Sequence, residues 1–204
     1  MKIRLVLIGT AALLLAVALY FGFLHNRSQD TTIDLAAWNS YSEEQLDEAL
    51  EAAFSETRLP EGQEKALLAW LFNQHPDRAE ALIREKAQDI ARLPFYLSDT
   101  ALDLVRIGAG EAGIRMLTVA RELYPNDPDV LSVSGIVSYL GGNPEAARRL
   151  LEDAAAWGQN RPIADFYLGG ILVTAESAAD QTRGKTLLMD LIRGENAELK
   201  ELAG

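Results

Sequence analysis

Apolar residues recur at helical spacing along most of this chain. The first such face lies in residues 42–54 and consists of Leu46, Ala49, Leu50, Ala53 and Phe54, at the i, i+3, i+4, i+7 and i+8 positions of a helix. Ser42 precedes this face and Gln45 follows it by three residues, which is the arrangement of a capping box. No segment alternates apolar and polar residues over the length of a strand. The pattern therefore predicts an all-α protein.

Prolines and glycines divide the rest of the chain into separate predicted helices. Helices are expected to end near His75 and Leu93, because each precedes a proline and such a residue disfavours the α region. From Pro94 onward the helices form pairs, separated by turns rich in glycine, proline and asparagine. The first helices of the pairs are predicted at 95–107, 129–140 and 163–175, and the second at 110–124, 144–157 and 181–193.

Small residues recur within these pairs at a spacing of 34 positions. The series are Ala101, Gly135 and Gly169 in the first helices, and Gly113 with Ala147 and Ala120 with Ala154 in the second helices. Small side chains let two helices approach closely, whereas large side chains fill the space between them. These seven positions are therefore predicted to pack the repeats.

This spacing is that of the tetratricopeptide repeat (TPR), a pair of antiparallel helices that stacks on copies of itself. About half of the chain, residues 94–194, resembles this family. The predicted repeat domain covers 94–204, with repeats at about 94–127, 128–161 and 162–197 and a C-terminal cap. Leu168-Gly169 matches the family pattern, but Ser134 and Thr100 replace the leucine in the other two repeats. The resemblance implies an α-solenoid, preceded by divergent or capping helices in residues 42–93.

The resemblance also implies a binding surface, because the first helix of each TPR pair lines a concave groove where peptides or partner helices dock. By position, the groove residues are Phe95, Ser98, Leu102, Val105, Arg106, Asp129, Ser132, Ile136, Tyr139, Phe166 and Val173. The set is mainly apolar and aromatic with one arginine, so an apolar peptide or helix is the expected ligand. Alternatively, residues 42–93 or a C-terminal helix at 195–202 fill the groove.

An uncharged run extends from Leu5 to Leu24, near the N-terminus. As a helix it spans about 30 Å, the thickness of a bilayer core. It predicts a signal anchor over residues 1–27, followed by a linker over residues 28–41. Cleavage of a signal peptide near Ala18, which would release a secreted protein, is the alternative.

Basic residues at the N-terminus set the expected orientation of this anchor. Lys2 and Arg4 precede the apolar run, and Asp30 and Asp34 follow soon after it. The positive-inside rule then keeps the N-terminus in the cytoplasm. The sequence therefore predicts a single-pass protein of the cytoplasmic membrane, with its C-terminal domain in the periplasm or otherwise outside the cytoplasm.

Charge and cysteine content exclude several classes of function. The chain carries 19 Lys and Arg against 30 Asp and Glu, a formal net charge of −11. Such an acidic surface repels nucleic acid, so no nucleic-acid partner is expected. With no cysteine in the chain, disulfides, thiolate catalysis and cysteine-ligated zinc are excluded.

Two patterns imitate sites for cofactors or metals. Residues 108–113 read G-x-G-x-x-G, but a dinucleotide site needs a preceding strand, and residues 101–107 have helical spacing. His25 and His75, the two histidines, lie too far apart for a metal-ligand pair. No catalytic, cofactor-binding or metal-binding residue and no small-molecule substrate is predicted, so an enzyme is disfavoured.

These observations predict a protein-protein interaction scaffold or assembly factor for an envelope complex, anchored outside the cytoplasm. The alternative is a periplasmic holdase or translocon-associated chaperone for exported proteins. A scaffold has one stoichiometric partner, whereas a holdase binds many unrelated unfolded chains. The identity of the partner is not encoded in any motif.

Overall fold

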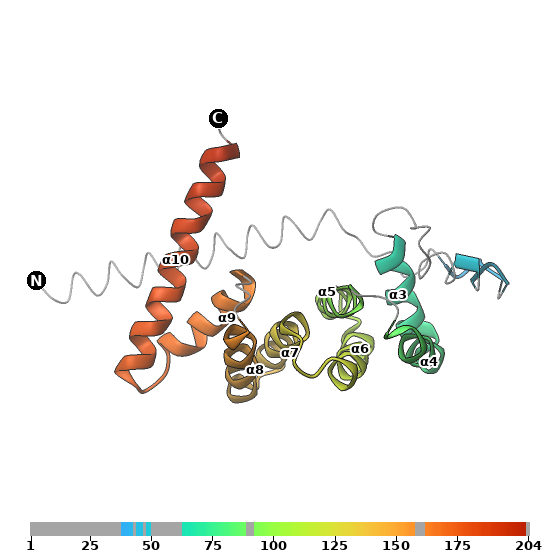
Figure 1. Cartoon of the computed structure of the whole chain (residues 1–204), viewed down its shortest axis with the longest axis horizontal. Helices are drawn as coiled ribbons and strands as arrows, with labels where there is room; N and C mark the ends of the chain where they lie inside the picture. Colours follow the sequence, from blue (N-terminus) through green and yellow to red (C-terminus); the bar gives the residue numbers. More distant parts are fainter. Residues whose placement is uncertain are drawn as a thin grey trace, which may run out of the picture. The chain divides into compact units, whose positions relative to one another are not determined.

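The computed structural model describes residues 38–42, 44–46, 48–49, 63–88, 92–157 and 162–202 (Figure 1). No strand occurs among them, which confirms the predicted all-α class. The helices are α3 (Gln63–Gln74), α4 (Pro76–Lys86), α5 (Leu93–Arg106), α6 (Gly110–Leu123), α7 (Pro128–Leu140), α8 (Pro144–Ala156), α9 (Pro162–Val173) and α10 (Ala178–Leu202). The predicted C-terminal segment 195–202 is the end of α10 rather than a separate helix.

Successive helices pack as hairpins, as the predicted pairing requires. α3 packs with α4, α5 with α6, α7 with α8 and α9 with α10. Neighbouring hairpins touch through their first helices, because α3 contacts α5, α5 contacts α7 and α7 contacts α9. One continuous hydrophobic core runs through these contacts, from Trp38 to Leu172. Each first helix is therefore covered on more than one side.

Small residues lie where the two helices of each hairpin come closest together. A Cβ atom at Gly113 would lie 2.7 Å from the carbonyl oxygen of Ala101 in the facing helix. In the next hairpin, a Cβ at Gly135 would lie 2.6 Å from Leu151 Cγ and 3.3 Å from the carbonyl oxygen of Ala147. Glycine suits both positions, because an added side chain would overlap the Ala101 carbonyl group at Gly113 and the Leu151 side chain at Gly135.

The last hairpin repeats this arrangement. A Cβ at Gly169 would lie 2.9 Å from Leu188 Cγ and 3.3 Å from the carbonyl oxygen of Gly184. Gly184 would in turn meet the backbone of Gly169 at 2.8 Å. The remaining small residues of the series, Ala120 and Ala154, are buried in the second helices at 0% and 2% exposure.

Two glycines end the first helices of successive hairpins. Gly108 and Gly142 have φ angles of 87° and 78°, in the left-handed region that favours glycine. In both turns the amide of the following residue donates to the carbonyl oxygen five residues earlier, at 2.9 Å. This is the bond of a Schellman motif. The two turns are thus built alike and lie one repeat period apart in the sequence.

The hairpin of α3 and α4 packs ahead of residue 94 in the same manner. Ala79 and Ile83 lie one repeat period before Gly113 and Leu117, and both are fully buried. Residues 42–93 are predicted to be divergent or capping helices, whereas Ala79 and Ile83 follow the 34-residue spacing. The contacts of α3 with α5 and of α4 with α6 extend the stack by one hairpin.

The segment before α3 contains the predicted capping box. The Ser42 amide donates to Gln45 Oε1 at 2.9 Å, and the Gln45 amide donates to Ser42 Oγ at 3.3 Å. These reciprocal bonds confirm the prediction. Nearby, Trp70 Nε1 of α3 donates to Asn39 Oδ1 at 2.8 Å, and Trp38 is 7% exposed within the core.

The structure contradicts the predicted single-pass membrane localisation. Among the described helices, none is both long enough and apolar enough to cross a membrane. α9 is apolar, but its 12 residues span about 18 Å of helix. α10 has 25 residues, but charged residues such as Arg183 and Asp190 interrupt it. The predicted anchor at residues 5–24 and the alternative cleavage site near Ala18 lie outside the described residues.

Candidate protein-binding surface

Burial divides the predicted groove residues into two groups. The residues packed between helices, at 5% exposure or less, are Ser98, Leu102, Ser132 and Ile136. Those that remain half-buried or exposed are Phe95, Val105, Arg106, Asp129, Tyr139, Phe166 and Val173. The first group cannot be presented to a ligand, because contacts between successive first helices cover it. A ligand would meet the second group.

Aromatic rings from α7 and α9 meet on this side of the stack. The ring centroids of Tyr139 and Tyr167 are 5.3 Å apart, with an angle of 65° between the ring planes. Phe166 meets Tyr167 edge-on, with centroids 5.6 Å apart. Edge-to-face pairs of this kind are favourable beyond the area that they bury. Tyr139 is 41% exposed, whereas Tyr167 is 7% exposed. The exposed Tyr139 ring therefore packs on the buried Tyr167 ring.

Arg106 of α5 belongs to the same neighbourhood. Burial is the main cause that raises the pKa of Tyr167; the positive charge of Arg106 acts in the opposite direction and Tyr139 raises it further. The charge of Arg106 thus acts on Tyr167, although the two residues belong to different hairpins. We define the aromatic surface as Arg106, Tyr139, Phe166 and Tyr167, contributed by three successive hairpins.

A partly buried lysine pairs with two aspartates of α5, one of which also contacts Arg106. Lys65 Nζ of α3 lies 2.6 Å from Asp99 Oδ2 and 2.8 Å from Asp103 Oδ2 of α5. Burial opposes its positive charge, but the two hydrogen-bonded carboxylates outweigh burial and raise the pKa of Lys65. Asp103 also lies 3.5 Å from Arg106 Nη1. Because a guanidinium carries several N–H donors, this single contact with Asp103 leaves other donors of Arg106 for a ligand.

Tyr167 was missed as a surface residue in the sequence analysis. It follows Val133 by one repeat period, and Val133 is fully buried. By repeat position Tyr167 is therefore a core residue, and the structure does bury it. Only its contact with the exposed Tyr139 connects it to the surface.

The two patterns that imitate cofactor or metal sites have structural roles. Gly108 ends α5 and Gly113 packs against Ala101, and the element before the glycine motif is a helix. His75 lies between α3 and α4, with its ring 5.1 Å from that of Trp70. Within the described ranges, no group of three or more potential metal ligands is gathered.

The aromatic surface offers two kinds of interaction. The rings of Tyr139 and Phe166 provide apolar contact area, and the Arg106 guanidinium provides donors for carbonyl or carboxylate oxygens. Comparison with protein-family models, curated proteins and solved structures gives no match. What the protein binds is therefore inferred from this surface.

Proposed function

We propose that this protein is a TPR-like scaffold or assembly factor that binds a partner protein through the aromatic surface. The observation that carries the proposal is the contact between the exposed Tyr139 of α7 and the buried Tyr167 of α9, two successive hairpins. Arg106 of α5, in the hairpin before them, adds a positive charge that acts on Tyr167. Stacked helical hairpins commonly present extended binding surfaces of this kind. The glycine turns at Gly108 and Gly142, one repeat period apart, support the TPR-like character.

The composition of the surface favours a protein ligand. Tyrosine and arginine are among the residues that contribute most to protein-protein affinity, because they combine contact area with hydrogen bonding. Tyr139 is exposed and rigidly supported by Tyr167, so little conformational entropy is lost when a partner packs on it. The expected ligand is an apolar segment that also carries a carboxylate or a free carbonyl group facing Arg106.

Site-specific photocrosslinking tests this proposal in cells. The photoreactive amino acid p-benzoylphenylalanine replaces Tyr139 in one variant and Ile114 in a control. Ile114 is 55% exposed on α6, a second helix of its hairpin. The proposal expects one defined adduct from position 139 that disappears when Arg106→Ala is added, and no such adduct from position 114.

Other adduct patterns would count against a scaffold. Equal adducts from both positions would show that the aromatic surface has no special role. A broad smear of unrelated chains from position 139, increased by heat shock, would instead favour the holdase alternative. If the adduct persisted in the Arg106→Ala background, Arg106 would not contribute to partner binding.

A further inference from the structure

A second exposed aromatic side chain lies near the other end of α7. Trp157 directly follows α8 and is 60% exposed, the highest value among the large apolar residues in the described segments. It borders a cleft of about 270 Å³, which is lined by Pro125, Asn126, Leu131, Asp153, Ala156 and Trp157. Leu131 lies in the first turn of α7, whereas Tyr139 of the aromatic surface lies in its last. The cleft and the aromatic surface are therefore separate.

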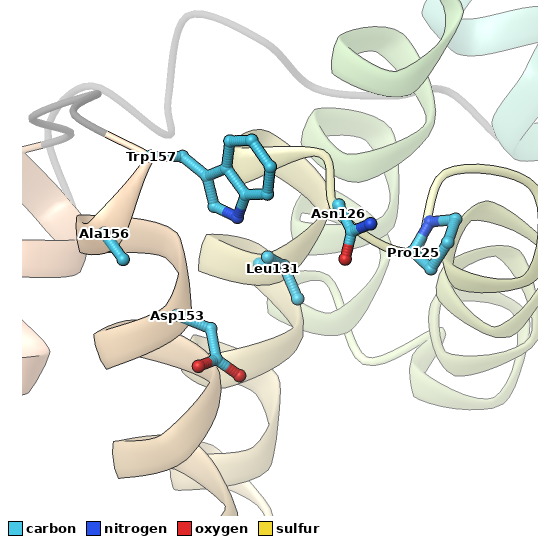
Figure 2. A pocket seen from close by; sticks show the side chains of 6 residues that line it. All are labelled: Pro125, Asn126, Leu131, Asp153, Ala156 and Trp157. Carbon is cyan, nitrogen blue, oxygen red and sulfur yellow. The ribbon is translucent and has the colours of Figure 1, made fainter.

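Both sides of the cleft combine apolar and polar groups. Figure 2 shows the indole of Trp157 and the carboxylate of Asp153 on the α8 side, facing Leu131 and the α6–α7 turn. On the other side, Leu131 and Pro125 provide apolar lining, and Asn126 provides a side-chain amide. An occupant thus needs an apolar stem and a polar head that suits a carboxylate.

Among the described residues, the Asp153 carboxylate forms no hydrogen bond or ion pair, although it is exposed on a helix that carries arginines. The adjacent Glu152, by contrast, pairs with Arg148 at 3.3 Å and with Arg183 at 3.0 Å. The charge of Asp153 is therefore available to a ligand.

The position of Asp153 in its helix adds to the negative potential. It lies in the last turn of α8, where the backbone carbonyl groups form the negative end of the helix dipole, and that turn contains no basic residue. A carboxylate at this end is unfavourable for the helix alone. A bound cation would be attracted by the carboxylate and by the carbonyl groups together.

We propose that this cleft binds an arginine side chain from a basic segment of a partner protein. The guanidinium would stack on the Trp157 indole and donate to the Asp153 carboxylate, while its aliphatic stem would lie on Leu131 and Pro125. Arginine suits the site better than lysine, because its planar head can stack and form paired hydrogen bonds at once. The net charge of −11 favours a basic partner in general. This inference does not rest on the aromatic surface.

Tryptophan fluorescence of the full chain provides a direct assay. The protein has three tryptophans, and Trp38 and Trp70 are only 7% and 3% exposed, so Trp157 dominates the solvent-sensitive emission. The probe is a capped Ala-Arg-Ala-Arg-Ala peptide, and its glutamine counterpart serves as the control ligand. We expect a saturable change in emission and protection from acrylamide quenching with the arginine peptide only.

Two variants that remove one negative charge each from α8 make the test specific. Asp153→Asn should weaken arginine-peptide binding about tenfold, which corresponds to about 1.4 kcal/mol. Glu145→Gln removes an exposed charge from the first turn of α8, outside the cleft, and should leave binding unchanged. Both variants retain Trp157 as the probe, and an unlowered thermal midpoint for Asp153→Asn would exclude unfolding as the cause.

Four results would overturn the proposal. The first is no saturable response to the arginine peptide. The second is an unchanged affinity in Asp153→Asn, which would separate the carboxylate from binding. The third is equal weakening by Asp153→Asn and Glu145→Gln, which would assign the effect to overall charge. A lysine peptide that binds as tightly as the arginine peptide would likewise contradict the stacking geometry.

Discussion

Replacement of Gly113 by alanine should destabilise the hairpin of α5 and α6, because the added methyl group has no space. Its Cβ would lie 2.7 Å from the carbonyl oxygen of Ala101 and 2.9 Å from Val105 Cγ2. The Val105 side chain can rotate, but the Ala101 carbonyl moves only with its helix. Overpacking of this kind costs about 1–3 kcal/mol. Alanine recovers about 1 kcal/mol of helix propensity relative to glycine, so the net loss is about 0–2 kcal/mol.

Gly110→Ala is the matched control, because it makes the same change in the same helix. A Cβ at Gly110 has no atom within 4 Å, so this variant should gain about 1 kcal/mol of helix propensity without any overpacking cost. Urea denaturation followed by circular dichroism compares the two variants, and Gly113→Ala should be the less stable by about 1–3 kcal/mol. In thermal unfolding, each kcal/mol corresponds to about 2–4 °C for a chain of this size. Equal stability of the two variants would refute the close approach of α5 and α6 at Gly113.

Three further predictions concern buried or charged side chains. The Thr100 hydroxyl is buried without a hydrogen-bond partner in the described part of the chain, so Thr100→Val should raise the free energy of unfolding by about 1–3 kcal/mol; an unchanged urea midpoint would contradict this. The pKa of Lys65 is raised in the folded state, so its ion pairs with Asp99 and Asp103 stabilise the fold fully below the ordinary pKa of 10.5. This stabilisation is lost as the pH rises through the higher pKa of the folded state. The stability difference between wild type and Lys65→Met should therefore shrink above pH 10.5; a constant difference would argue against the pairs. Asp153→Asn removes a negative charge that has no ion pair among the described residues and lies at the negative end of α8, so it should stabilise the fold by about 0.3–1 kcal/mol in thermal denaturation at low salt. A clear loss of stability would show that Asp153 has a stabilising partner.

Helix positions were predictable from the sequence because local signals determine them. Pro128 and Pro162 begin α7 and α9. The fixed φ angle of proline suits the first turn of a helix, and the backbone N–H that proline lacks would have no partner within the helix at this position. Gly108 and Gly142 end the preceding first helices in the left-handed conformation. α10 is the exception. The prediction that it ends at residue 193 is wrong: no proline follows that position, and the helix continues to Leu202.

The exposed face of the first helices was less predictable, because it depends on neighbouring hairpins. Helical spacing identifies one apolar stripe, but α5 and α7 are each covered by several helices. Ser98 and Ser132 are therefore buried although their polarity and repeat position indicated a groove. The Lys65–Asp99 pair joins two helices that are distant in the sequence, so no local pattern reveals it either.

Partner affinity of the aromatic surface is the measurement that tests the proposed function most directly. The partner identified by crosslinking at position 139 is purified, and its Kd is measured by calorimetry for wild type, Arg106→Ala, Tyr139→Ala and the control Ile114→Ala. Arg106→Ala and Tyr139→Ala should each raise Kd about tenfold or more, since hot-spot truncations cost more than about 1 kcal/mol. Ile114→Ala should leave Kd unchanged. An unchanged Kd in Tyr139→Ala, with the fold intact, would contradict binding through this surface.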